Sequence, residues 1–164
     1  MSYSDSEISK LVYNHPVTST SRMCFAYSHG GLHKGIDYQM GAGTPIYAIA
    51  PGKVIATSYS GTSRSDLWGN YTVIDHGGWA AGYAHQSEIG VEVGQIVKAG
   101  QKIGKIGSTG NSTGPHLHLD LYSTVSNGRE SGRLAHWQRV KSVMFVAGRK
   151  YPDGTVAGDY KPGT

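Results

Sequence analysis

The chain has 164 residues, of which 38% are hydrophobic and only 16% are charged, as expected for one folded domain. Its 24 glycines argue against a helical bundle, and its single cysteine excludes an intrachain disulfide and a cysteine-based zinc finger. No apolar run approaches the roughly 20 residues of a membrane span, and no secretory signal is visible at the amino terminus.

Positive charge is concentrated towards the carboxyl terminus. Residues 1–128 contain eight basic and eight acidic side chains, whereas residues 129–164 contain seven basic and three acidic ones. The net charge of +4 therefore lies in the second of these segments. Such a segment suits a polyanionic partner, for example nucleic acid or an anionic cell wall, and equally suits a solvated face that favours solubility.

The amino-terminal region predicts a short helix within residues 4–14, because Ser4 and Glu7 have capping-box spacing before an apolar stripe. From residue 16 to about 122, short apolar runs alternate with glycine and asparagine, which predicts strands. The predicted strands are 45–50, 53–58, 71–76, 79–85, 95–98, 102–107 and 116–122. Their connections are too short for crossover helices, so the sheet should be mostly antiparallel.

The remaining segments complete the predicted organisation. Residues 59–69 predict a polar loop, and residues 131–150 predict a helix, or a helix followed by a strand at 143–147. Residues 151–164 have the composition of a linker or tail. The expected fold is therefore mainly β, with α+β character only at the margins: one domain over residues 1–150, with an antiparallel sheet core and short helices near the termini.

Histidines and carboxylates gather in two short segments. In an extended segment His33 and Asp37 point to one side, and Gly35 between them leaves space. His116 and His118, two residues apart on a strand, share one face. Each segment therefore places potential metal ligands together.

The neighbouring residues support this interpretation. Leu117, Leu119 and Leu121 would face away from the histidines and enter the core. Asp120 falls on the histidine face, where it could orient an imidazole. His85 ends another predicted strand and adds a fourth histidine to the set.

Two or three histidines with one carboxylate form a ligand set typical of zinc, and a catalytic zinc takes three protein ligands. The spacing allows His33, Asp37 and either His116 or His118 as ligands. The other member of that pair, with His85, would remain beside the metal to move protons or stabilise a transition state.

These segments belong to a longer ordered pattern between residues 27 and 122. It includes His-Lys-Gly-Ile-Asp at 33–37, Gly-Tyr-Ala-His at 82–85 and Gly-Pro-His-Leu-His at 114–118. In this pattern the chain resembles the lysostaphin-like zinc endopeptidases, which cut peptide bonds in bacterial peptidoglycan. The resemblance implies one Zn²⁺ per chain, held by His33, Asp37 and His118.

The resemblance also implies how the remaining site residues act. His85 and His116 would be the catalytic histidines, and Tyr27 would help to hold the oxyanion. A narrow groove with the zinc in it would be walled by loops, here residues 59–69 and the segment after Tyr122.

The expected substrate is peptidoglycan, cut in the cross-bridge or the stem peptide. Residues 129–150 are expected to contact anionic wall polymers; no nucleic acid or membrane partner is expected, and the protein should be a monomer. Without a visible signal, the chain is expected to be a phage endolysin made in the cytoplasm and released to the wall, or a trimmed form of a secreted enzyme. A wall-binding domain could follow the linker-like tail.

Three other functions fit parts of the sequence. A catalytically silent wall-binding or regulatory homologue is disfavoured by the complete ligand set. A non-haem iron oxygenase would usually space its first histidine and carboxylate more closely than His33 and Asp37 are spaced. A biotinyl carrier is suggested by the run at 97–104, but that interpretation leaves the histidines unexplained.

Overall fold

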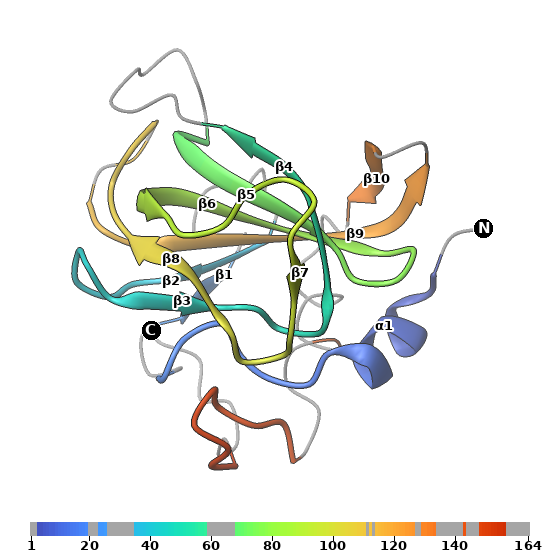
Figure 1. Cartoon of the computed structure of the whole chain (residues 1–164). Coiled ribbons are helices and arrows are strands. Elements are labelled where there is room, and N and C mark those ends of the chain that lie inside the picture. Colours follow the sequence, from blue (N-terminus) through green and yellow to red (C-terminus); the bar gives the residue numbers. More distant parts are fainter. Residues whose placement is uncertain are drawn as a thin grey trace.

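The computed structural model describes residues 3–19, 23–25, 35–58, 68–110, 112, 114–126, 129–133, 143 and 148–156 (Figure 1). Within these residues the chain forms one α-helix and ten strands. They are α1 (Asp5–Leu11), β1 (Met23–Phe25), β2 (Ile36–Tyr38), β3 (Pro45–Tyr47), β4 (Gly52–Ser58), β5 (Asn70–Asp75), β6 (Ala80–Ile89), β7 (Ile96–Val97), β8 (Lys102–Ile106), β9 (Leu117–Ser126) and β10 (Arg129–Arg133).

The strands form one sheet in which every pairing between named strands is antiparallel, which confirms the expected fold class. The main order is β1-β2-β9-β6-β5-β4-β7; β10 pairs with β9, and β8 pairs with β3 and β6. The two long strands β6 and β9 therefore lie side by side in the middle of the sheet (Figure 1).

The predicted amino-terminal helix is present as α1. Ser4 caps it: the Ser4 hydroxyl accepts from the Glu7 amide, and the Glu7 carboxylate accepts from the Ser4 amide. This reciprocal capping box satisfies amides that have no partner inside the helix. None of the helices in the described part of the chain has the length and apolar character that a bilayer crossing requires.

Strand β9 carries the alternation that the sequence predicts. Leu117, Leu119 and Leu121 are fully buried in the core. His118 and Asp120 alternate with them and face the other side of the sheet. One strand therefore anchors the core and presents polar side chains to the site.

The core also fixes a histidine that takes no part in the site. His76 is buried; its Nδ1 donates to the Pro51 carbonyl at 3.0 Å, and its Nε2 lies 3.3 Å from the Tyr83 hydroxyl. That hydroxyl accepts from the Ile49 amide at 3.0 Å. Burial lowers the pKa of His76 to about 4, despite partly opposing backbone hydrogen bonds and the charge of Asp75. His76 therefore ties three segments of the core together as a neutral group.

The carboxyl-terminal region differs from the prediction. The expected helix over 131–150 is wrong at its start, because residues 131–133 belong to β10 and pair with an extended β9. An Asn-Gly pair at 127–128, a favourable sequence for a two-residue hairpin, is the signal that predicts this strand pair. Apart from residue 143 and residues 148–150, the rest of the predicted helix lies outside the described residues.

Residues 148–156 pack against the amino-terminal segment. The buried Arg149 guanidinium donates to the carbonyls of Ser9 (2.8 Å), Val143 (2.5 Å) and Val12. The amide of His15 donates to the Lys150 carbonyl at 2.9 Å. The two ends of the described chain are therefore joined by backbone and side-chain hydrogen bonds.

Candidate metal centre

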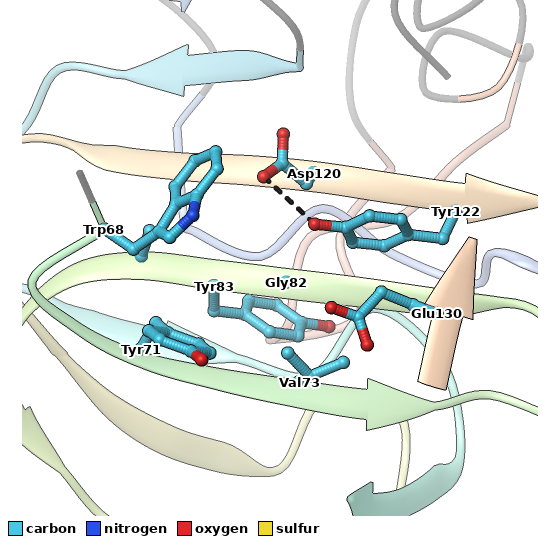
Figure 2. Close-up of a pocket in the computed structure, with 9 residues that line it drawn as sticks. Trp68, Tyr71, Val73, Gly82, Tyr83, Asp120, Tyr122 and Glu130 are labelled. Atoms are coloured by element: carbon cyan, nitrogen blue, oxygen red, sulfur yellow. Dashed lines mark hydrogen bonds between the residues drawn. The ribbon is translucent and has the colours of Figure 1, made fainter. Parts of the chain in front are cut away.

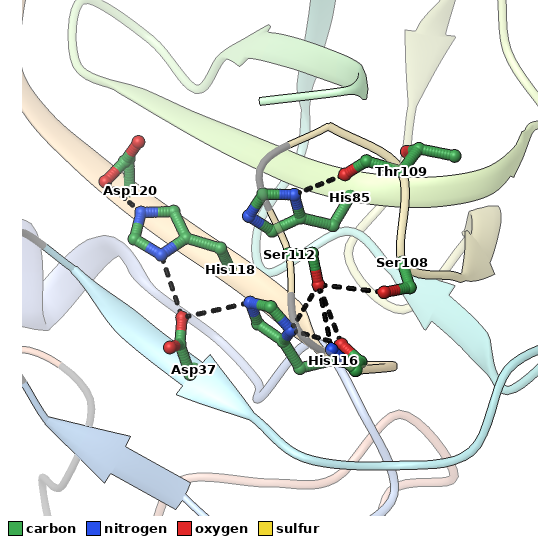
Figure 3. A network of polar contacts seen from close by, with 9 residues as sticks. Asp37, His85, Ser108, Thr109, Ser112, His116, His118 and Asp120 are labelled. Carbon is green, nitrogen blue, oxygen red and sulfur yellow. Dashed lines mark hydrogen bonds and ion pairs between the residues drawn. The ribbon is translucent and has the colours of Figure 1, made fainter. Parts of the chain in front are cut away.

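Strand pairing brings two of the predicted ligands together. In the antiparallel register of β2 and β9, Asp37 lies opposite His118. The Nδ1 of His118 lies 2.8 Å from an oxygen of Asp37, and its Nε2 lies 2.8 Å from an oxygen of Asp120 (Figure 3). All three side chains are buried. The imidazole of His118 is thus held between two carboxylates.

This arrangement favours positive charge at His118. Burial lowers the pKa of His118, but the charges and hydrogen bonds of Asp120 and Asp37 outweigh burial and raise it to about 9. The carboxylates therefore stabilise a cation at this point. The cation can be the protonated imidazole itself. It can also be a metal ion bound between Asp37 and the Nδ1 of His118.

The donor set fits zinc. An oxygen of Asp37 and the Nδ1 of His118 are close enough to bind one ion, since Zn²⁺ takes such ligands at about 2.0–2.2 Å. The Asp120 carboxylate then accepts a hydrogen bond from Nε2 of His118. This bond fixes the orientation of the ring, as expected from the sequence. Two predicted residues, His33 and Tyr27, lie outside the described residues, within which no group of three metal-binding side chains occurs.

Gly35 leaves space beside this pair, as the sequence predicts. Its φ is +109°, a backbone conformation that strongly favours glycine. A Cβ there would lie 2.3 Å from the Leu119 carbonyl oxygen, 2.8 Å from an oxygen of Asp120 and 3.2 Å from the Nε2 of His118. Any side chain at this position would therefore press on the groups that hold His118.

His85 sits at an irregularity of β6, where the pairing with β5 shifts register. Its φ of +61° is unusual for a residue with a side chain, and hydrogen bonds to Trp68 (2.8 Å) and Gly107 (3.0 Å) hold its backbone. Its Nδ1 lies 2.7 Å from the Thr109 carbonyl, which can only accept, so Nδ1 carries the proton. Burial is the main cause that lowers the pKa of His85 to about 4. The ring is therefore neutral near pH 7, with Nε2 able to accept a proton.

His116 has a similar arrangement. Its Nδ1 donates to the Gly114 carbonyl at 2.8 Å and lies 3.3 Å from the Ser112 hydroxyl. Its Nε2 lies 3.8 Å from an oxygen of Asp37. The ring centre of His85 is 4.6 Å from that of His116 and 6.1 Å from that of His118. The structure thus brings four of the predicted site residues together (Figure 3).

Thr109, Ser112 and Trp68 also belong to the site, although no sequence pattern assigns them a role. Thr109 and Ser112 lie in the glycine-rich run directly before His116, and their position there is the signal that could reveal them. The Trp68 ring lies 5.2 Å from the His118 ring, at the end of the predicted wall loop. Residues 59–67 of that loop lie outside the described residues.

A hollow opens to solvent beside this centre (Figure 2). It lies over β5, β6 and β9 and shares Trp68 and Asp120 with the centre. Its lining residues are Trp68, Tyr71, Val73, Gly82, Tyr83, Ala84, Asp120, Tyr122 and Glu130. Glu130, from the segment after Tyr122, is one of these residues, while the zinc-containing groove that the resemblance implies stays a prediction.

Sequence comparisons relate this chain to known proteins. The model of Peptidase family M23 matches residues 31–132. Lysostaphin of Staphylococcus simulans is 46% identical over 103 residues, which cover 60% of this chain and 20% of that protein. Peptidoglycan DD-endopeptidase ShyA of Vibrio cholerae is 44% identical over 133 residues, which cover 76% of this chain and 29% of that protein. The chain thus spans less than a third of the length of these two relatives.

Solved structures of peptidases are similar to this chain in fold. Lysostaphin from S. simulans superposes with a TM-score of 0.61 at 31% identity, covering 79% of this chain and 55% of that one. A zinc-containing peptidase from V. cholerae superposes with a TM-score of 0.56 at 34% identity, covering 73% of this chain and 38% of that one. The fold of this chain is therefore similar to that of solved peptidases.

Proposed function

This chain belongs to peptidase family M23, and from that premise we propose that it is a zinc-dependent endopeptidase that hydrolyses peptide bonds in bacterial peptidoglycan. The observation that carries the proposal is the convergence of His85 and His116 on the buried Asp37–His118 pair. The names of its relatives, lysostaphin and a peptidoglycan DD-endopeptidase, support this substrate class.

Zinc would be held by His33, Asp37 and His118, and would supply Lewis-acid chemistry that polarises a peptide carbonyl and makes water more acidic. Asp120 keeps His118 in the required orientation through its hydrogen bond to Nε2. A carboxylate in this position also increases the basicity of the imidazole.

His85 is suited to accept a proton from the attacking water. Its Nδ1 proton is committed to the Thr109 carbonyl, so the lone pair of Nε2 remains on the opposite side of the ring. Because the ring is neutral near pH 7, that lone pair is available. The water oxygen bonds to the carbonyl carbon while its proton passes to this nitrogen.

His116 is suited to act at the other stage of the reaction. Its Nδ1 donates to the Gly114 carbonyl, and its Nε2 faces Asp37 and the reacting region. When protonated, it can stabilise the negative oxygen, while the proton that His85 has taken from water passes to the leaving amine as the C–N bond breaks. Tyr27 would add a hydrogen bond to the same oxygen.

The biological setting is part of the proposal. The chain would act as a monomer on the outer or periplasmic side of a bacterial envelope, for example as a phage endolysin. Apart from the buried Arg149, the basic residues between 129 and 150 would contact anionic wall polymers. Cross-bridge and stem peptide are both candidate substrates.

Digestion of purified peptidoglycan tests this function. The zinc-loaded protein should release new amino groups, and mass spectrometry of defined muropeptides should identify the bond that is cut. A chelator should stop the release, and added zinc should restore it. The His116→Ala variant serves as the control for a contaminating hydrolase. Zinc-loaded wild-type protein that releases no amino groups would contradict the proposal and favour a silent homologue.

A further inference from the structure

We infer that the hollow beside the metal centre binds the ammonium group of a substrate side chain next to the scissile bond, with Glu130 as its counter-ion. The inference rests on the proposed endopeptidase function and narrows its substrate. It assigns this surface to a residue with an apolar stem and a terminal amine, such as lysine or another diamino acid, rather than to glycine alone.

The hollow is close enough to the reacting groups to receive a neighbouring side chain. Asp120 and Trp68 line it, and both also contact His118. Residues two apart on a strand are separated by about 6.6 Å, so Asp120 and Tyr122 lie one and two such steps from His118 along β9. An extended substrate centred on the metal would therefore place an adjacent side chain over this surface.

Small residues of β6 create the space. Ala84 lies opposite His118, and Gly82 lies opposite Asp120 in the pairing of β6 with β9. A Cβ at Gly82 would come within 3.6 Å of the Tyr122 ring, so even alanine would reduce the opening. Larger side chains at these positions would fill the hollow, and their absence leaves room for an aliphatic chain.

The walls suit an alkyl ammonium group. The rings of Trp68, Tyr71 and Tyr122 line the hollow, and aromatic rings attract cations while packing against methylene groups (Figure 2). No lysine or arginine is among the lining residues of the described chain. The surface therefore offers apolar contacts together with negative electrostatic potential.

Glu130 supplies the full negative charge. Strand β10 places it against β9, opposite Val125, and its carboxylate reaches the hollow near Tyr122 and Val73 (Figure 2). This half-buried carboxylate forms no hydrogen bond or ion pair with any other residue that the structure describes. Charge-assisted hydrogen bonds from an ammonium group would satisfy it.

Matched peptides test the inference. A peptide that the protein cuts is made with lysine or with norleucine beside the scissile bond, since norleucine keeps the methylene groups and lacks the amine. The wild-type kcat/KM should favour the lysine peptide by about tenfold, as one charged hydrogen bond predicts. In Glu130→Gln the ratio of the two values should fall to near one. The Glu92→Gln variant, which changes an exposed carboxylate outside the hollow, should keep the wild-type ratio.

A binding measurement separates this inference from the proposed function. The indole N–H resonance of Trp68 is followed during titration with N-acetyl-lysine methylamide or its norleucine analogue. A larger shift with the lysine compound, lost in Glu130→Gln, is expected whether or not peptidoglycan is hydrolysed. Equal shifts with both compounds, or equal cleavage of both peptides by wild type, would overturn the inference while leaving the endopeptidase function intact.

Discussion

His85 shows how single residues are adapted to the site. Its left-handed backbone is costly for a residue with a side chain, and such strain persists only where neighbouring groups enforce it. Trp68 and Gly107 hold its amide and carbonyl, while Thr109 holds its ring. The shift in register turns the imidazole away from regular strand geometry and towards His116. The strained backbone of His85 therefore accompanies the placement of its ring next to His116.

Replacement of Gly35 tests the packing around His118. Gly35→Ala should displace Asp120 or His118, because the new Cβ would overlap the Leu119 carbonyl. Zinc affinity should fall at least about tenfold, as it does when outer-shell partners of a ligand are disturbed. Isothermal titration with zinc measures the change.

Gly43→Ala is the matched control. Gly43 also has a positive φ, of +88°, but a Cβ there would meet no atom within 4 Å. Both variants carry backbone strain, but only the new methyl group of Gly35→Ala would contact Asp120 and His118. Equal zinc affinity in the two variants would show that Gly35 acts through backbone conformation alone.

Among the elements, the segment containing Arg149 has an unusual role. Its guanidinium joins residue 143 to the carboxyl-terminal end of α1, where carbonyl groups lack helical partners. A cation is favoured at this end of a helix. The basic segment therefore includes at least one residue whose charge is used inside the fold, alongside those available to a partner.

Removing that guanidinium should destabilise the domain. Arg149→Met leaves the carbonyls of Ser9, Val12 and Val143 without this donor and should lower the free energy of unfolding by about 2–4 kcal/mol. Urea denaturation measures the loss. The control Lys98→Met removes an exposed charge and should change stability by less than about 0.5 kcal/mol. Similar midpoints for the two variants would contradict an anchoring role.

The sequence predicts most elements because local signals and burial agree. The capping box at Ser4 and the alternation of leucine with polar residues around His118 are of this kind. The Arg149 contacts and the bulge at His85 join segments far apart in the chain, so no local pattern encodes them. The predicted helix over 131–150 is wrong at its start, residues 131–133, because pairing with β9 outweighs a weak helical periodicity there.

For the whole molecule, neutral buried histidines link stability to pH. Burial is the first cause that lowers the pKa of both His15 and His76 from 6.5 to about 4. Below pH 6.5 the unfolded chain binds protons that the folded chain does not accept, so folding loses stability as pH falls towards 4. The raised pKa of His118 has the opposite effect: it lowers stability as pH rises from 6.5 to 9, outside the range in which His15 and His76 titrate.

Urea unfolding at pH 7, 6, 5 and 4.5 checks this dependence. Stability should fall steadily below pH 6.5, by a few kcal/mol in total. His76→Gln should be less stable at pH 7 but show a shallower decline, because one of the titrating groups is gone. A slope that His76→Gln leaves unchanged would assign the pH dependence to other groups.

The uneven charge of the molecule predicts salt-sensitive binding to cell walls. Raising ionic strength from low salt to about 0.5 M shortens the Debye length to below about 5 Å and should weaken wall association. Sedimentation with purified walls measures the bound fraction. Replacing the basic residues between 129 and 150 by glutamine, except Arg149, should reduce both binding and its salt dependence. Binding that ignores salt and these replacements would assign the charge to solubility.

His116, directly before β9, and His118, within β9, are assigned different tasks. Zinc content and peptidoglycan hydrolysis, measured side by side on His116→Ala and His118→Ala, test this assignment most directly. His118→Ala should lose both zinc and activity, because two remaining ligands cannot hold the ion. His116→Ala should keep about one zinc per chain while its rate falls at least about 100-fold. Loss of zinc from His116→Ala, or full zinc content in His118→Ala, would contradict the assignment.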